Sequence, residues 1–110
     1  MNILQEIQNG HGKRFSVQVE EKEVGHAYLY ILTNDLHERP FGFLEDVHLD
    51  ESMRGQGIGK ILIKEIIDEA KAQNCYKLIG TSRYERDMVH QFYKKLGFDD
   101  YGKEFRLNFE

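Results

Sequence analysis

The chain has 110 residues, of which 40% are hydrophobic and 31% are charged, a balance typical of one globular domain and not of a disordered segment. Its formal net charge is −4, from 15 Lys and Arg against 19 Asp and Glu, which argues against binding a nucleic-acid phosphate backbone. The single cysteine, Cys75, excludes an internal disulfide bond and a cysteine-based metal cluster.

The first half of the chain predicts three strands. Residues 14–20 alternate apolar and polar side chains, the period-two pattern of a half-buried strand. The polar residues 21–23 predict a tight turn, and residues 24–33 are rich in the aromatic and β-branched types that favour a second strand. A polar loop containing Pro40 follows, and residues 41–49 predict a third strand.

The hydrophobic period then changes to that of a helix. Between residues 57 and 72 the apolar side chains recur every three to four positions, with charged residues between them, which predicts an amphipathic helix. Asn74 is a plausible stop signal for this helix. Residues 76–82 predict a fourth strand.

The last quarter of the chain predicts a second helix and a final extended segment. Asp87 is placed to cap a helix over residues 88–96, and Gly97 is placed to end it in the left-handed conformation. Residues 98–109 alternate apolar and polar side chains, which predicts a last extended pair.

This order of elements predicts an α/β or α+β fold. Hairpins make the first three strands antiparallel, and the strand–helix–strand step requires a parallel crossover, so the sheet is mixed and mostly antiparallel. With no repeat and no linker, we expect a single domain over residues 1–110.

The longest apolar stretch, residues 27–32, is far shorter than the roughly 20 residues of a membrane span, and the N-terminus does not look like a targeting signal. We therefore expect a cytoplasmic protein without membrane or nucleic-acid partners.

The most informative segment is the turn RGQGIGK, residues 54–60, between the third strand and the first helix. Gly55, Gly57 and Gly59 permit positive φ and a close approach of a ligand to the backbone. The N–H groups that open the helix have no partner inside it, and Arg54 and Lys60 add positive charge. These features predict a phosphate or pyrophosphate cradle, since a turn without a ligand needs one glycine and not three.

Two common phosphate motifs do not fit this turn. A P-loop requires a glycine where Arg54 stands and a serine or threonine where Ile61 stands. A dinucleotide fingerprint requires a third glycine where Lys60 stands. An NTPase and a dehydrogenase are therefore excluded.

The pattern R/Q-x-x-G-x-G/A, met by Arg54, Gly57 and Gly59, resembles the acetyl-CoA pyrophosphate loop of the GNAT superfamily of N-acetyltransferases. Tyr93, Gly97 and Phe98 match the Y-x-x-x-G-F signature of that superfamily's closing helix, and the resemblance covers roughly residues 14–109. Within the superfamily the chain is most similar to the glucosamine-6-phosphate N-acetyltransferase branch. That similarity is carried by Glu45–Asp46, Cys75–Tyr76–Lys77 and Phe92–Tyr93.

The resemblance implies a GNAT-like fold in a minimal version with a shortened N-terminus. It also implies a homodimer that transfers an acetyl group from acetyl-CoA to a primary amine of a small molecule by direct attack in a ternary complex. No metal is implied, and Cys75 is not needed as a nucleophile. The resemblance assigns the pantetheine arm to backbone groups of Val47, His48 and Leu49, and the pyrophosphate to Arg54, Gly55, Gln56, Gly57, Ile58, Gly59 and Lys60.

Glu45 is the first candidate for the general base. In a regular strand it shares a face with Phe43, Val47 and Leu49, and a carboxylate on an apolar face holds a proton more readily. Asp46 lies on the opposite face, where it is a candidate for orienting the amine. A bulge in this strand would exchange the two assignments. The alternative is that both residues form a solvated acidic pair.

Tyr93 is the candidate general acid, because a phenol can donate a proton to the departing thiolate. The alternative is that Tyr93 is a helix residue packed on the sheet. Arg86 stands seven residues before Tyr93, where many members of the superfamily carry Asn. The five histidines show no spacing of metal ligands, so no metal site is expected.

Two other functions remain open at this point. One is a non-catalytic CoA-binding sensor or interaction module on the same fold. The other is a protein N-acetyltransferase, since a short N-terminus leaves the acceptor cleft more open. The sequence by itself does not identify the amine acceptor.

Overall fold

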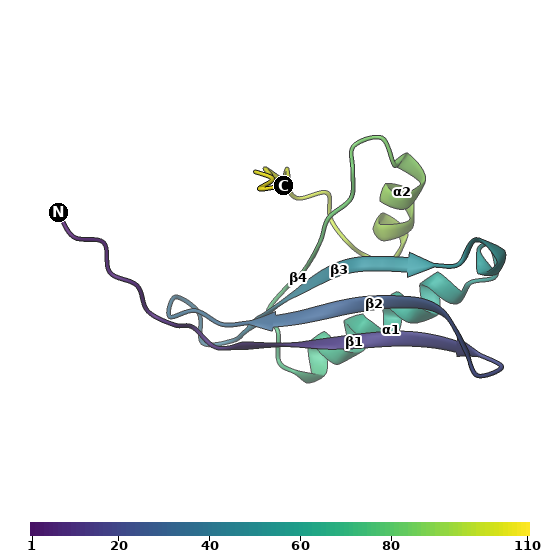
Figure 1. Ribbon diagram of the computed structural model, residues 1–110, viewed down its shortest axis with the longest axis horizontal. Coiled ribbons are helices and arrows are strands. Elements are labelled where there is room, and N and C mark those ends of the chain that lie inside the picture. Colours follow the sequence, from purple (N-terminus) through teal and green to yellow (C-terminus); the bar gives the residue numbers. More distant parts are fainter. The chain divides into compact units, whose positions relative to one another are not determined.

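The computed structural model describes residues 1–110. These residues form two compact units, Met1–Gly80 and Thr81–Glu110. The first unit carries the sheet, a 3₁₀ turn η1 and the helix α1, and the second carries the helix α2 (Figure 1). The bounds of the elements are β1 Gly10–Val19, β2 Lys22–Leu32, β3 Phe41–Leu49, η1 Glu51–Met53, α1 Ile58–Ala72, β4 Leu78–Gly80 and α2 Asp87–Lys95.

The sheet has the order β1-β2-β3-β4. The first three strands are antiparallel, and β4 pairs with β3 in parallel after the crossover through α1. The predicted mixed, mostly antiparallel sheet with a strand–helix–strand crossover is therefore confirmed. The predicted third strand has the bounds of β3, whereas β1 begins earlier than predicted and β4 is only three residues long.

The hairpin between β1 and β2 turns on two residues, Glu20 and Glu21, because Val19 pairs with Lys22. Both glutamates have positive φ, 51° and 66°, as a two-residue turn of the mirror-image type requires. The predicted turn at residues 21–23 thus lies one residue too late. Asparagine and glycine tolerate this conformation better than glutamate does, so the turn stores backbone strain.

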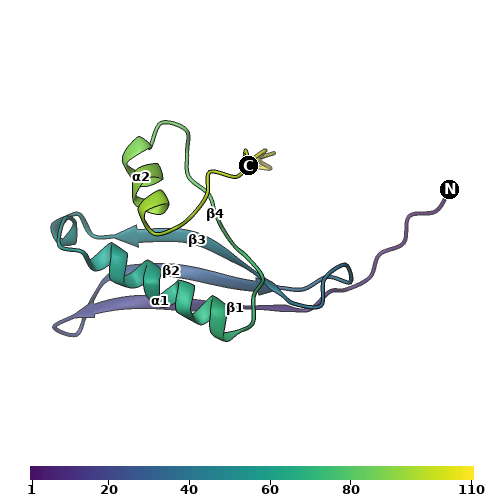
Figure 2. The same ribbon diagram turned by 180° about the vertical axis from the view of Figure 1, so that it is seen from behind.

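The core lies between one face of the sheet and α1, which runs across the sheet in front of the strands in Figure 2. The side chains of Leu29, Ile63 and Ile66 are fully buried there. The alternation of β2 explains this arrangement, because Ala27, Leu29 and Ile31 point to the helix while their neighbours point to the other face. The remaining buried apolar side chains are Val24, Leu44, Leu62 and Ala70.

In the second unit, α2 begins after Arg86 and not after a capping aspartate. Asp87 is the first residue of the helix, and no side chain caps its N-terminus, so the prediction that Asp87 caps the helix is wrong. The carboxylate of Asp87 still lies in the first turn, where a negative charge favours the helix dipole. Gly97 has φ 102°, as predicted for the residue that ends the helix. The N–H group of Gly97 donates a hydrogen bond of 3.0 Å to the carbonyl oxygen of Lys94, and that of Phe98 donates one of 3.1 Å to the carbonyl oxygen of Tyr93. These two hydrogen bonds form a Schellman motif.

The predicted extended pair over residues 98–109 is not formed, and this segment has no regular secondary structure. The alternating side chains of Phe105, Leu107 and Phe109 are 91%, 78% and 93% exposed. The prediction failed because alternation fits a strand but does not supply a partner, and a strand is stable only when its backbone is paired.

Candidate active site

The parallel pairing of β3 with β4 covers only the first part of β3. Gly42, Phe43 and Leu44 pair with β4, and no strand of the sheet lies on that side of residues 46–49. Backbone N–H and C=O groups along this edge therefore have no ladder partner on the β4 side. This free edge contains Val47, His48 and Leu49, the residues predicted to contact the pantetheine arm.

A β-bulge interrupts β3 at the start of the free edge. Tyr28 on β2 pairs with Glu45, and His26 pairs with His48, so Asp46 and Val47 together face a single residue of β2. Asp46 has φ 48°, a left-handed conformation that is uncommon for a residue other than glycine. The bulge thus turns the side chain of His48 to the face that carries Glu45.

The prediction that Glu45 shares an apolar face with Phe43, Val47 and Leu49 is therefore correct for Phe43 and wrong for Leu49. Glu45 shares its face with Phe43, and this face is opposite to the one that carries Leu44 and packs on α1. Leu49, which pairs with Gly25, lies on the α1 side and not beside Glu45, because the extra residue of the bulge reverses the alternation.

An open depression of about 450 Å³ lies over the bulge, lined by His26, Tyr28, Asp46, Val47 and His48. Asp46, Val47 and His48 were predicted as site residues, and the structure brings these three together. Glu45 precedes them on β3, directly across from Tyr28. His26 was not predicted as a site residue, because only the register of β2 on β3 reveals it as a neighbour of the bulge.

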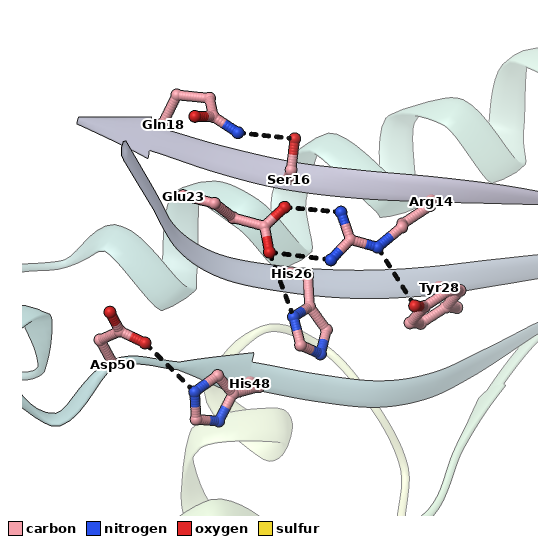
Figure 3. Close-up of polar contacts among 8 residues, drawn as sticks. All are labelled: Arg14, Ser16, Gln18, Glu23, His26, Tyr28, His48 and Asp50. Atoms are coloured by element: carbon pink, nitrogen blue, oxygen red, sulfur yellow. Dashed lines mark hydrogen bonds and ion pairs between the residues drawn. The ribbon is translucent and has the colours of Figure 1, made fainter. Parts of the chain in front are cut away.

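Polar side chains of β1, β2 and β3 lie on the face of the sheet that carries the depression (Figure 3). Arg14 holds Glu23 through two hydrogen bonds of 2.6 and 2.8 Å and donates a third, of 3.1 Å, to the hydroxyl of Tyr28. These hydrogen bonds from Arg14 lower the pKa of Glu23 below its usual value. His26 Nδ1 lies 3.8 Å from Glu23, so the carboxylate links β1 to the edge of the depression.

The glycine-rich turn has the predicted backbone conformation at two of its three glycines. Gly55 and Gly57 have φ 78° and 79°, whereas Gly59 lies inside α1. A Cβ atom added at Gly55 or Gly57 would meet no atom within 4 Å, so the backbone there is open to a ligand. Arg54 closes the turn onto the end of β3, since its Nε donates to the carbonyl oxygen of Leu49 at 3.2 Å.

The start of α1 can bind an anion. Gly57 is the N-cap residue, and the first hydrogen bond of the helix runs from Ile61 N to its carbonyl oxygen. The N–H groups of the three residues between them, Ile58, Gly59 and Lys60, have no partner inside the helix. They point out of its positive end beside the open glycines, an arrangement that fits a phosphate or pyrophosphate group.

Tyr93 lies on α2, among aromatic rings of its own unit. The centroids of Phe92 and Phe98 are 5.7 and 5.2 Å from that of Tyr93. Burial raises the pKa of the Tyr93 phenol above its ordinary value of 10, and the positive charge of Arg86 opposes this effect in part. The phenol therefore keeps its proton at neutral pH, as a proton donor must.

The structure contains no group of three His, Cys, Asp or Glu side chains that could hold a metal ion. None of its helices is long and apolar enough to cross a membrane. Burial raises the pKa of the Cys75 thiol, so this cysteine is predominantly the neutral thiol and not a reactive thiolate.

The mixed sheet, the open glycine turn at a helix start and the free strand edge beside it are features of one class of acyl-transferring domains. The model of the acetyltransferase (GNAT) family matches residues 2–98, and the chain belongs to this family.

Relatives with known names agree with this assignment. The chain is 40% identical over 70 residues to the glucosamine 6-phosphate N-acetyltransferase of Trypanosoma brucei brucei. This match covers 64% of this chain and 46% of that protein. The chain thus spans about half the length of that relative. Among solved structures, a putative acetyltransferase from Agrobacterium tumefaciens is 31% identical, with a TM-score of 0.83 over 88% of this chain and 68% of that chain. The glucosamine-6-phosphate N-acetyltransferase of Arabidopsis thaliana is 24% identical over 90% of this chain and 67% of that chain; its TM-score of 0.81 shows the shared fold.

Proposed function

We propose that the chain is an acetyl-CoA-dependent N-acetyltransferase that acts on a primary amine of a small molecule. The observation that carries this proposal is the open glycine turn at the start of α1, which lies next to the free edge of β3 in a chain of the GNAT family. The glycine turn lies in Met1–Gly80, and the Y-x-x-x-G-F signature that begins at Tyr93 lies in Thr81–Glu110. Because each unit contains one motif of the family, we also propose that residues 1–110 work as one acetyltransferase domain. The single Cys75 suits a reducing compartment such as the cytoplasm.

The turn and the free edge have complementary roles in binding acetyl-CoA. The N–H groups at the start of α1 receive the pyrophosphate, with Arg54, Gln56 and Lys60 around it, and the missing Cβ atoms of Gly55 and Gly57 let it approach the backbone. The edge of β3 offers the backbone groups of Val47, His48 and Leu49 to the amide groups of the pantetheine arm. In this proposal the thioester lies at the bulge, beside Glu45 and Asp46.

The acidic pair and Tyr93 carry the chemistry in this proposal. The bulge follows Glu45 and leaves it on the face of Phe43, so Glu45 keeps the role of base. It removes a proton from the acceptor's ammonium group, and Asp46 orients that group. The free nitrogen then forms a bond to the thioester carbonyl carbon, the bond from that carbon to sulfur breaks, and the nitrogen loses its second proton to solvent. Tyr93 gives its proton to the departing thiolate and regains one from solvent. The acetyl group ends on the amine, and no covalent bond to the protein forms.

An acceptor screen tests the proposal. The purified chain is mixed with acetyl-CoA and one amine at a time, and thiol release is followed. The panel contains glucosamine 6-phosphate, the acceptor named for the T. brucei relative, together with glucosamine, polyamines, amino acids and peptides. Release that depends on a small amine supports the proposal. Binding of acetyl-CoA by calorimetry without any release would favour a CoA sensor, and release with peptides alone would favour a protein N-acetyltransferase.

A further inference from the structure

We propose that the imidazoles of His26 and His48 form the hydrogen-bonding site for the acceptor amine, a binding role that neither the family assignment nor the sequence predicts. The inference rests on the proposed function and adds the residues that hold its acceptor. The two ring centroids are 5.4 Å apart across β2 and β3, and both rings line the depression at the bulge.

A carboxylate stands at one nitrogen of each ring. His48 Nε2 lies 3.3 Å from Asp50, and His26 Nδ1 lies 3.8 Å from Glu23 (Figure 3). Because a carboxylate can only accept a hydrogen bond, it favours the tautomer of a neutral imidazole with the proton on the nearer nitrogen. The other nitrogens, Nε2 of His26 and Nδ1 of His48, are thus left as hydrogen-bond acceptors.

Other contacts hold this arrangement in place. Arg14 fixes Glu23 by two hydrogen bonds, so the carboxylate behind His26 is itself anchored to β1. The ring of Tyr28 packs edge-on against that of His26, with centroids 5.8 Å apart. The bulge turns His48 to the same face, since His48 pairs directly with His26. These features align two acceptor nitrogens on one side of the sheet.

The charges around the pair define the chemical class of the ligand. Asp46 lies in the same depression and Asp50 stands behind His48, whereas the charges of Glu23 and Arg14 cancel in their ion pair. A negative site that also offers two acceptor nitrogens suits a cationic hydrogen-bond donor: a primary ammonium group, with a hydroxyl group on a neighbouring carbon for the second imidazole.

Paired variants test the assignment with glucosamine as the probe, because it carries an amine next to a hydroxyl group. The double variant His26→Phe with His48→Phe keeps two rings but removes both acceptor nitrogens. We expect the KM for glucosamine to rise by roughly 10- to 100-fold, the range for lost hydrogen bonds to a charged group, with kcat within about twofold. The variant His26→Gln with His48→Gln keeps acceptor oxygens and should restore much of the affinity. His11→Phe is the matched control, since His11 pairs with Ile31 and so lies on the α1 face.

A second variant tests the contact that fixes the tautomer of His48. Asp50→Asn leaves both rings in place and should raise KM in the same direction, so the proposal stays testable if the double variant does not fold.

The outcomes separate this inference from the proposed function. If the wild-type chain acetylates no amine, the proposed function fails and this inference falls with it. If the wild-type chain acetylates glucosamine while the double Phe variant binds acetyl-CoA normally and keeps the wild-type KM, only the inference is overturned. A wild-type chain that acetylates other amines but never glucosamine also overturns it.

Discussion

At the residue scale, the raised pKa of Tyr93 leads to a prediction about the departing thiolate. Tyr93→Phe keeps the aromatic ring that packs on Phe92 and Phe98, so folding and acetyl-CoA affinity should change little. Turnover should fall on the order of 10²-fold, within the usual range for a general acid. The loss should appear equally in kcat and in kcat/KM, because the interaction is made only in the transition state. If Tyr93→Phe turns over at the wild-type rate while chemistry is rate-limiting, Tyr93 is only a packing residue.

The same phenol predicts the alkaline limb of the pH profile. A raised pKa means that Tyr93 keeps its proton at a pH where an ordinary tyrosine is half ionised. Activity should therefore persist to about pH 10 and fall only above it, and this fall should be absent from Tyr93→Phe. Steady-state rates at saturating substrates across that range measure the limb, provided that circular dichroism shows the fold intact.

Glu45 makes a different prediction from Tyr93, because its proposed role is on the acceptor and not on the leaving group. Glu45→Gln should lower kcat by roughly 10²- to 10⁴-fold near neutral pH, the range for loss of a general base. The defect should shrink as pH rises, since more of the amine is already deprotonated in solution. A defect of the same size at every pH would mean that Glu45 does not take the proton. Asp46→Asn provides the comparison, as its proposed role is to orient the amine.

At the scale of elements, the turn into α1 predicts how acetyl-CoA binds. Gly57→Val places side-chain atoms in the open space above the turn and forces a β-branched residue to a φ of 79°. We expect acetyl-CoA affinity to fall at least tenfold, about 1.4 kcal/mol. Gly102→Val is the matched control, because that glycine is also in open space but lies outside the turn. Unchanged affinity by calorimetry in a folded Gly57→Val variant would contradict the phosphate cradle.

The β1–β2 hairpin gives a prediction about stability. Replacing Glu20 and Glu21 by Asn and Gly supplies the residue types that the positive φ values of this turn favour. The folded state should gain about 1 kcal/mol through relief of strain, which corresponds to a rise in Tm of roughly 4–8 °C for a domain of this size. Thermal unfolding followed by circular dichroism measures this shift. The reversed order, Gly and then Asn, should give a smaller gain.

At the scale of the whole molecule, the exposed C-terminal segment favours a homodimer. Phe105, Leu107 and Phe109 leave three large apolar side chains in solvent, at alternate positions of a segment without a strand partner. We predict that this segment pairs with a second copy of the chain, which would bury these side chains and satisfy their backbone. Light scattering at tens of micromolar should give twice the monomer mass. Replacing all three residues by serine should give monomers, and a monomeric wild-type chain would refute the prediction.

Local patterns in the sequence were sufficient for most of the fold. The alternation of β2 and the helical spacing of α1 each depend on burying one face, so the side-chain period reveals the element. The glycine turn was predictable for a similar reason, because positive φ at Gly55 and Gly57 is a property of the local backbone. Residues 98–109 show the limit of this reasoning, since their alternation could not indicate whether a partner strand exists.

What the sequence by itself determined is the family, the glycine turn and the positions of Glu45, Asp46 and Tyr93 along the chain. Only the tertiary structure decided which side chains share a face at the bulge. The extra residue in β3 reverses the alternation after Asp46, and this moves Leu49 away from Glu45 and brings His48 beside His26. The register of two strands far apart in sequence controls such contacts, because it depends on pairing across the sheet and not on the order of residues within either strand.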